Sequence, residues 1–102
     1  MANEQLDYLG YLKIKQLTSC QELESARHGE PAHIEMLYII VHQAYELWFK
    51  EILHELESVI AMFDADNVNE KNMGIAVARL RRITSIQRVL IEQINVLETM
   101  TP

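Results

Sequence analysis

A histidine near the middle of the chain has neighbours at helical spacing that could do chemistry with it. Tyr38 lies four residues before His42, and Tyr45 and Glu46 lie three and four residues after it, so a helix would place all four on one face. An imidazole changes charge near neutral pH and can accept or donate a hydrogen bond, which suits it to orienting a ligand. A histidine among aromatic residues is also commonly a buried or boundary residue. The residues alone leave both interpretations open.

Metal binding is a second possibility. Glu51 and His54 have the Glu-x-x-His spacing of carboxylate-bridged di-iron helical bundles. Such a centre needs a second Glu-x-x-His on another helix, and this sequence has none. We therefore favour surface residues beside a bundle, and we predict no metal ligand. The sequence also lacks a glycine-rich phosphate loop, a Cys-x-x-Cys pair and a nucleophile elbow.

The charges of the chain narrow the classes of partner. Acidic residues outnumber basic ones by 15 to 9, and the net charge of −6 disfavours binding to nucleic acid or to an anionic membrane. The basic cluster within residues 79–88 is best interpreted as a solvated or interface face paired with glutamate, with anion binding as the alternative. The single cysteine, Cys20, excludes an internal disulfide and favours a reducing, cytoplasmic location. No apolar run is long enough to span a membrane.

Two long apolar periodicities predict the elements that would position these residues. The stretches 32–63 and 70–99 contain no proline, and each has an apolar stripe at close to 3.6 residues per turn, which predicts two helices. The loop 64–69 joins them, and Asn67 with Glu70 is a plausible capping pair for the second helix. Residues 1–31 read as an N-terminal arm with short helices. In this arm Thr18 or Ser19, with Glu22, could cap a piece that begins near Gln21.

The predicted fold class is all-α: a single helical unit, residues 1–102, with two long antiparallel helices and a broken N-terminal segment. The segment is suggested by Leu6, Leu9 and Leu12 with Tyr8 and Tyr11. A hairpin of two such helices has too wide an apolar surface to cover by itself. We therefore predict that a homo-oligomer, a dimer or tetramer, completes the bundle.

Three segments of the sequence resemble one family. The longest is PAHIEMLYIIVHQAYELWFK at residues 31–50, with YLGYL at residues 8–12 before it and VLETMTP at residues 96–102 after it. They occur in the order and at the spacings of tryptophan 2,3-dioxygenases, and the resemblance covers essentially the whole chain. The HQ-x-YELWFK segment is long and unusual, which makes the match specific.

The resemblance implies an all-helical, tetrameric, cytosolic haem enzyme that adds both atoms of O₂ across the indole C2–C3 bond of L-tryptophan, giving N-formylkynurenine. It assigns His42 as the catalytic residue, accepting a hydrogen bond from the indole N–H. Tyr38 would pack on the substrate. The other substrate-binding residues would be Tyr8, Tyr11 and Leu12, lent to a neighbouring subunit, and Leu97 would line the haem pocket.

The chain departs from the family pattern in two places, and we expect it to lack parts of the family's site. Ile34 replaces an aspartate, and Tyr38 replaces a phenylalanine. The family's carboxylate-binding arginine and the haem's proximal histidine are expected after Pro102. We therefore expect haem only by resemblance, with no haem bound and no turnover by this chain alone. The alternative is a stand-alone, dioxygenase-derived helical protein that serves oligomerisation or interaction without catalysis.

Overall fold

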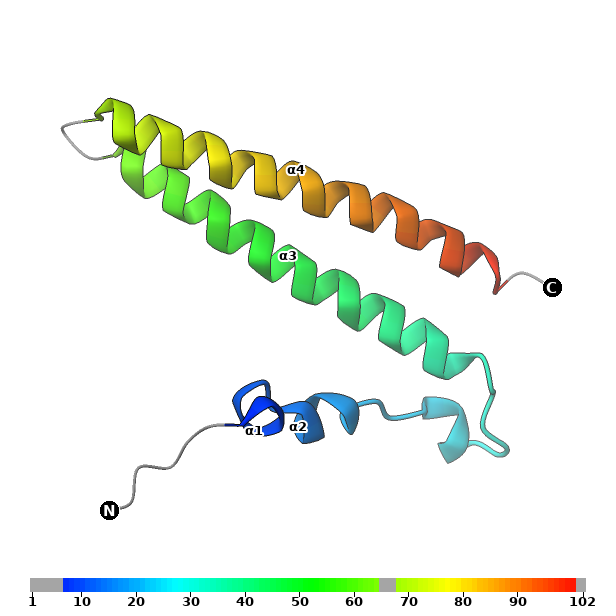
Figure 1. Ribbon diagram of the computed structural model, residues 1–102. Helices are drawn as coiled ribbons and strands as arrows, with labels where there is room; N and C mark the ends of the chain where they lie inside the picture. The colour runs from blue at the N-terminus through cyan, green and yellow to red at the C-terminus, as the bar shows by residue number, and fades with distance from the viewer. Residues whose placement is uncertain (1–6, 65–67, 101–102) are drawn as a thin grey trace, which may run out of the picture. The chain divides into compact units, whose positions relative to one another are not determined.

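The computed structural model describes residues 7–64 and 68–100, so Leu6 and Asn67 lie outside the described part. Its element order is α1 (Tyr8–Tyr11), α2 (Ile14–Thr18), the 3₁₀ helix η1 (Glu24–Arg27), α3 (Glu35–Phe63) and α4 (Glu70–Glu98) (Figure 1). The described residues contain helices and no strand, which confirms the predicted all-α class. The chain divides into two units, one ending at Ile39 and the other beginning at Ile40. Each is described by itself.

The second unit is an antiparallel hairpin in which most of α3 packs along α4 (Figure 1). Its buried apolar residues come from both helices: Val41, Val59, Ala76 and Ile86. Burial of this seam from water supplies the main force that pairs the helices. Other apolar residues of the two helices nevertheless stay exposed in this chain, among them Leu47, Ile60 and Leu80.

The start of α4 corrects one prediction from the sequence. The helix begins at Glu70 as expected, but its N-cap is Asn69 rather than Asn67. The Asn69 side chain accepts a hydrogen bond from the Asn72 backbone N–H at 2.8 Å. This bond satisfies one of the N–H groups that the first helical turn leaves unpaired.

The N-terminal unit is built from short pieces. Asp7 caps α1 by accepting a hydrogen bond from the Gly10 N–H at 2.7 Å, and a Cβ at Gly10 would lie 2.9 Å from that same carboxylate. Glycine at this position therefore leaves room for the cap. No residue of α1, α2 or η1 is buried.

The prediction that Thr18 or Ser19 caps a following helix is wrong. Thr18 and Ser19 cap no following helix: their hydroxyls donate back to the carbonyls of Ile14 and Lys15 at the start of α2. This is a common local alternative for such residues, because a short hydroxyl side chain can reach the carbonyl of the preceding turn. The next helical piece starts only at Glu24, after Leu23, which makes no side-chain cap.

Candidate functional site

Helix α3 carries the two residues assigned to the indole. Tyr38 and His42 are four residues apart on this helix, so they lie one turn from each other. Both are exposed, and 52% of Tyr38 is accessible. His42 is therefore not a buried core histidine in this chain. The helix therefore carries an aromatic ring and an imidazole one turn apart on its exposed surface.

A tyrosine one turn further on ties α3 to its neighbour. The Tyr45 hydroxyl donates to the Leu90 carbonyl of α4 at 2.6 Å. Its ring lies beside that of Phe49, with centroids 6.0 Å apart and an interplanar angle of 37°. This bond joins the two helices three residues beyond His42. It therefore restrains the part of α3 from which His42 projects.

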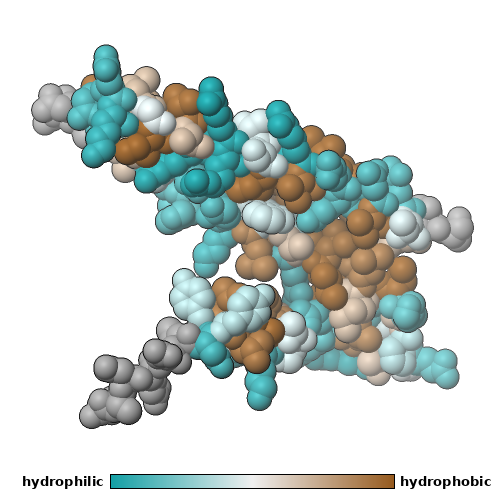
Figure 2. Space-filling view, viewed as in Figure 1, coloured by the Kyte–Doolittle hydropathy of each residue, from teal (hydrophilic) through white to brown (hydrophobic). Residues whose placement is uncertain are grey.

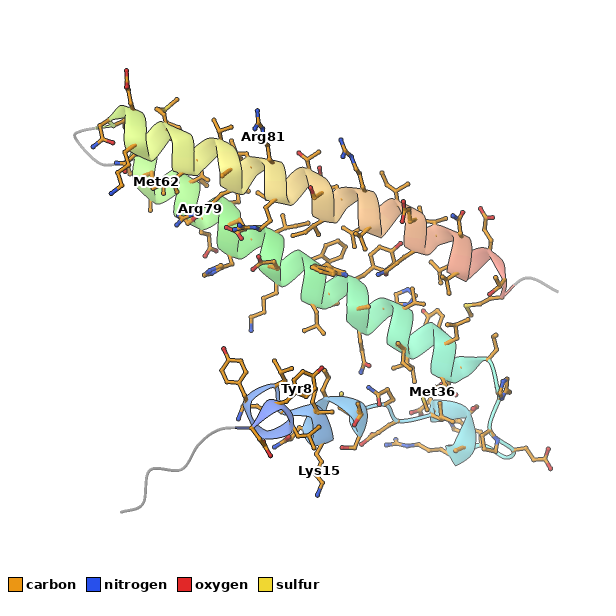
Figure 3. All side chains as sticks on the ribbon, in the orientation of Figure 1. Tyr8, Lys15, Met36, Met62, Arg79 and Arg81 are labelled. Carbon is orange, nitrogen blue, oxygen red and sulfur yellow. The ribbon has the colours of Figure 1, made fainter. Side chains whose placement is uncertain are left out.

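The remaining predicted site residues fall in other elements. Tyr8 and Tyr11 belong to α1 and are 72% and 69% exposed, and Leu12 follows directly at 43%. Figure 3 labels Tyr8 on α1. Leu97 lies in the last turn of α4 and is half-buried. Tyr38 and His42 thus share helix α3, while Tyr8, Tyr11 and Leu12 lie in α1 and directly after it.

An ion pair inside the hairpin was not predicted. Arg82 Nη1 of α4 donates to Glu55 Oε2 of α3 at 2.9 Å, and Glu55 is only 6% exposed. The hydrogen bond from Arg82 holds the pKa of the Glu55 carboxyl below its usual range and raises that of the guanidinium. The sequence does contain a signal, because Glu55 occupies a seam position between Ile52 and Val59.

The basic cluster comprises four arginines: Arg79, Arg81, Arg82 and Arg88. Arg82 has a glutamate partner, as the interpretation of a paired arginine face predicts. Figure 3 shows Arg81 pointing away from the hairpin.

The carboxylates, histidines and long helices of the described residues bear on metal binding and on membrane spanning. Among residues 7–64 and 68–100, no three His, Cys, Asp or Glu side chains come together in a way that could hold a metal ion. His54 is exposed on α3. In the same part of the chain, no helix combines the length and the hydropathy that crossing a bilayer requires.

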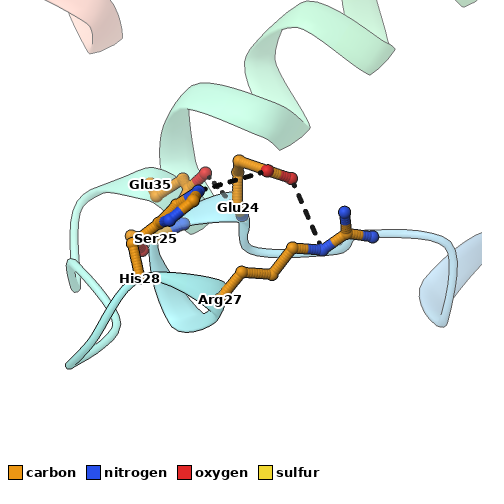
Figure 4. Close-up of polar contacts among 5 residues, drawn as sticks. All are labelled: Glu24, Ser25, Arg27, His28 and Glu35. Carbon is orange, nitrogen blue, oxygen red and sulfur yellow. Dashed lines mark hydrogen bonds and ion pairs between the residues drawn. The ribbon is translucent and has the colours of Figure 1, made fainter.

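A second unpredicted polar cluster precedes α3 (Figure 4). The Glu35 carboxylate accepts hydrogen bonds from the Glu24 N–H at 2.9 Å, the Ser25 N–H at 3.1 Å and the Ser25 hydroxyl at 2.5 Å. These bonds lower the pKa of the Glu35 carboxyl, and the bond from the Ser25 hydroxyl contributes most. Helix α3 starts at Glu35 rather than at residue 32 as predicted, and before it the Ala32 N–H donates to the Ser25 hydroxyl at 2.9 Å.

Fold and surface together define a class: a helical hairpin with an exposed histidine and tyrosine on its first long helix, preceded by an aromatic N-terminal segment. Comparison with known proteins gives the family. The tryptophan 2,3-dioxygenase family model matches residues 1–102, and the chain belongs to that family.

Relatives of the same name come from distant organisms. The chain is 55% identical to the tryptophan 2,3-dioxygenase of Bdellovibrio bacteriovorus over 95 residues, which are 93% of this chain and 26% of that protein. It is 50% identical to the Dictyostelium discoideum enzyme over 94 residues, 92% of this chain and 24% of the relative. The corresponding identity with the Mus musculus enzyme is 47% over 97 residues, 94% and 24% of the two chains. The chain thus spans about a quarter of the length of these relatives.

Proposed function

We propose that this chain forms the N-terminal part of a haem-dependent tryptophan 2,3-dioxygenase acting in tryptophan catabolism. The reaction adds both atoms of O₂ across the indole C2–C3 bond of L-tryptophan and gives N-formylkynurenine. The family match supports this proposal along the whole chain. The observation that carries it is the exposed pair Tyr38 and His42, one turn apart on α3 within the segment most typical of the family.

In this proposal His42 orients the substrate. A neutral imidazole nitrogen accepts the hydrogen bond of the indole N–H and fixes the ring by one defined contact. Tyr38 covers a face or edge of the indole. Its hydroxyl, absent from the phenylalanine usual in the family, needs a polar partner wherever the substrate buries it. Leu12 and the rings of Tyr8 and Tyr11 complete the apolar wall, in the site of a neighbouring subunit.

We expect that the described residues do not enclose a haem by themselves. His42 is exposed and Leu97 is half-buried, so a porphyrin against them would remain open to water. The family resemblance also gives His42 to the substrate rather than to the iron. We therefore assign to this chain one wall of the site and derive no step through the haem.

A homo-oligomer, dimer or tetramer, is part of the same proposal. Large apolar side chains on both long helices are exposed, including Leu53 at 55%, Ile60 at 55% and Ile91 at 65%. Figure 2 shows apolar side chains gathered over the helices on one face. Contiguous apolar surface of this kind is typical of protein interfaces. We place the protein in the cytoplasm, for which the lone exposed Cys20 is the supporting feature.

A polypeptide of residues 1–102 tests which properties of the site this part of the protein supplies by itself. We expect light scattering to give a dimer or tetramer, and we expect no Soret band at one haem per chain after haem is added. With tryptophan, O₂ and a reductant it should form no N-formylkynurenine. A monomer of 11.9 kDa at micromolar concentration would reject the oligomer. Robust turnover would show that the chain holds a haem ligand that we have not assigned.

The exposed hairpin surface also favours a second candidate: a stand-alone helical protein for oligomerisation or interaction, without catalysis. The protein expressed from the complete reading frame separates the two. N-formylkynurenine formation by that protein supports the dioxygenase. Its absence, together with a stable oligomer, supports the second candidate.

A further inference from the structure

Four hydrogen bonds close the connection between η1 and α3 into what we call the Ser25–Glu35 latch. It consists of the three bonds accepted by the Glu35 carboxylate, from the Glu24 N–H, the Ser25 N–H and the Ser25 hydroxyl, and the bond from the Ala32 N–H to that hydroxyl. The Ser25 hydroxyl therefore links the backbone before α3 to a side chain in its first turn. Figure 4 shows the facing Ser25 and Glu35 side chains.

The latch fixes the path of the chain between its two ends. Residues 26–34 run from one end to the other and include Gly29 at φ +145°, a conformation that other residues rarely adopt. An ionised carboxylate is a stronger acceptor than a neutral oxygen, and one that receives three donors resists rotation. The nearby contacts of Glu24 with Arg27 and His28, at 3.7 and 3.6 Å, are exposed and add little.

The position of the latch connects it to the site. Glu35 is the first residue of α3, three residues before Tyr38 and seven before His42. Ser25 and Glu24 belong to η1, through which the segment with Tyr8, Tyr11 and Leu12 reaches α3. We propose that the Ser25–Glu35 latch is a positioning device for the tryptophan site, and that Glu35 is a positioning residue. It fixes the path of the chain from η1 into the first turn of α3, three residues before Tyr38. This inference rests on the proposed function.

The distribution of buried residues explains why hydrogen bonds, rather than apolar packing, fix the path of the chain in the N-terminal unit. None of α1, α2 and η1 contains a buried residue, so the N-terminal unit has little apolar packing to hold it in place. The hairpin has its own buried seam, with Val41, Val59, Ala76 and Ile86. Opening the latch should therefore release the N-terminal segment and leave the hairpin folded.

The test compares variants of the protein expressed from its complete reading frame. Glu35→Gln keeps the shape of the side chain but leaves one acceptor oxygen, and its NH₂ group would face the Glu24 N–H. Ser25→Ala removes the hydroxyl that links Ala32 to Glu35. Ser25→Thr keeps that hydroxyl and serves as the conservative rescue. Glu30→Gln removes the same charge from an exposed residue of the same connection and is the matched control.

Two readouts are needed. Hydrogen exchange at the amides of Glu24 and Ser25 should speed up about tenfold or more in Glu35→Gln, because opening becomes easier. The KM for L-tryptophan should rise about tenfold while kcat changes less than about threefold, since the loss is one of substrate positioning. Ser25→Ala should shift both in the same direction. Ser25→Thr and Glu30→Gln should stay within about twofold of the unmodified protein.

Several results would overturn the proposal. Unchanged exchange in Glu35→Gln would show that no latch restrains these amides. Faster exchange with unchanged KM would make the latch purely structural, as would a loss of helix content or haem in that variant. An unmodified protein with protected amides and no turnover would instead reject the proposed function, and the positioning role with it.

Discussion

The hairpin and the N-terminal unit are each stabilised by a different kind of interaction. In the hairpin, apolar side chains from α3 and α4 bury one another, and one internal ion pair joins Glu55 to Arg82. The N-terminal unit buries no residue of its three short helices and depends on hydrogen bonds, chiefly the Asp7 cap and the Ser25–Glu35 latch. The hydrophobic seam is broad and non-directional, whereas the latch depends on a few atoms. Small chemical changes should therefore affect the two units differently.

The contrast bears on the proposed roles of the two units, because we propose that His42 acts in the site of its own chain and that Tyr8, Tyr11 and Leu12 act in the site of a neighbouring subunit. His42 projects from the hairpin, next to the turn that Tyr45 ties to α4. Tyr8, Tyr11 and Leu12 come from the unit with no buried helical residue. Changes in the N-terminal segment should therefore disturb the apolar wall formed by Tyr8, Tyr11 and Leu12 more than they disturb the orientation of the substrate by His42.

The largest expected effect on stability comes from the seam. Ile86→Ala should lower the free energy of unfolding of the hairpin by about 2–5 kcal/mol, because Ile86 is 6% exposed and its removal leaves a cavity. Urea unfolding followed by far-UV circular dichroism measures this. Glu92→Ala, at an exposed residue of the same helix, is the control and should cost less than about 1 kcal/mol. An equally large loss from Glu92→Ala would contradict the assignment of the effect to the buried seam.

Acid should weaken both units, through separate carboxylates. The pKa values of Glu55 and Glu35 lie below the usual range, so their contributions are complete above the unfolded-state pKa of about 4.3 and are lost as the pH falls through the lower folded value. We expect a smaller loss of hairpin stability than in Ile86→Ala. Glu55→Gln should reduce the dependence of the hairpin's melting temperature on pH in the acid range. Glu35→Gln should reduce the acid dependence of the protection of the Ser25 amide from hydrogen exchange. If either variant reduced both pH dependences, the two units would not be independent.

The smallest of these effects concerns the cap of α4. Asn69→Ala should destabilise the hairpin by about 1 kcal/mol, because it leaves the Asn72 N–H without its side-chain acceptor. Asn69→Asp keeps an acceptor and should restore most of the loss. Thermal melting of the two variants measures the difference. Equal melting temperatures for Asn69→Ala and the unmodified chain would show that this cap contributes nothing.

The long helices could be predicted from the sequence because their signals are local and repeated. Apolar spacing marks α3 and α4, and the motif around His42 identifies the family without any structure. The Ser25–Glu35 latch could not be predicted, since its partners lie ten residues apart and no periodicity links them. The Asn69 cap was assigned to Asn67 because both asparagines precede the helix within three residues, and pattern alone does not choose between them.

Turnover of a His42 variant tests the central claim most directly. In the protein expressed from its complete reading frame, His42→Ala should lower N-formylkynurenine formation from L-tryptophan by about 10²-fold, because the indole N–H loses its acceptor. His33→Ala, which alters an exposed histidine before α3, should leave turnover within about twofold. Turnover of His42→Ala equal to that of His33→Ala would contradict the assignment of His42 to the substrate, and with it the role that we give this chain in the site.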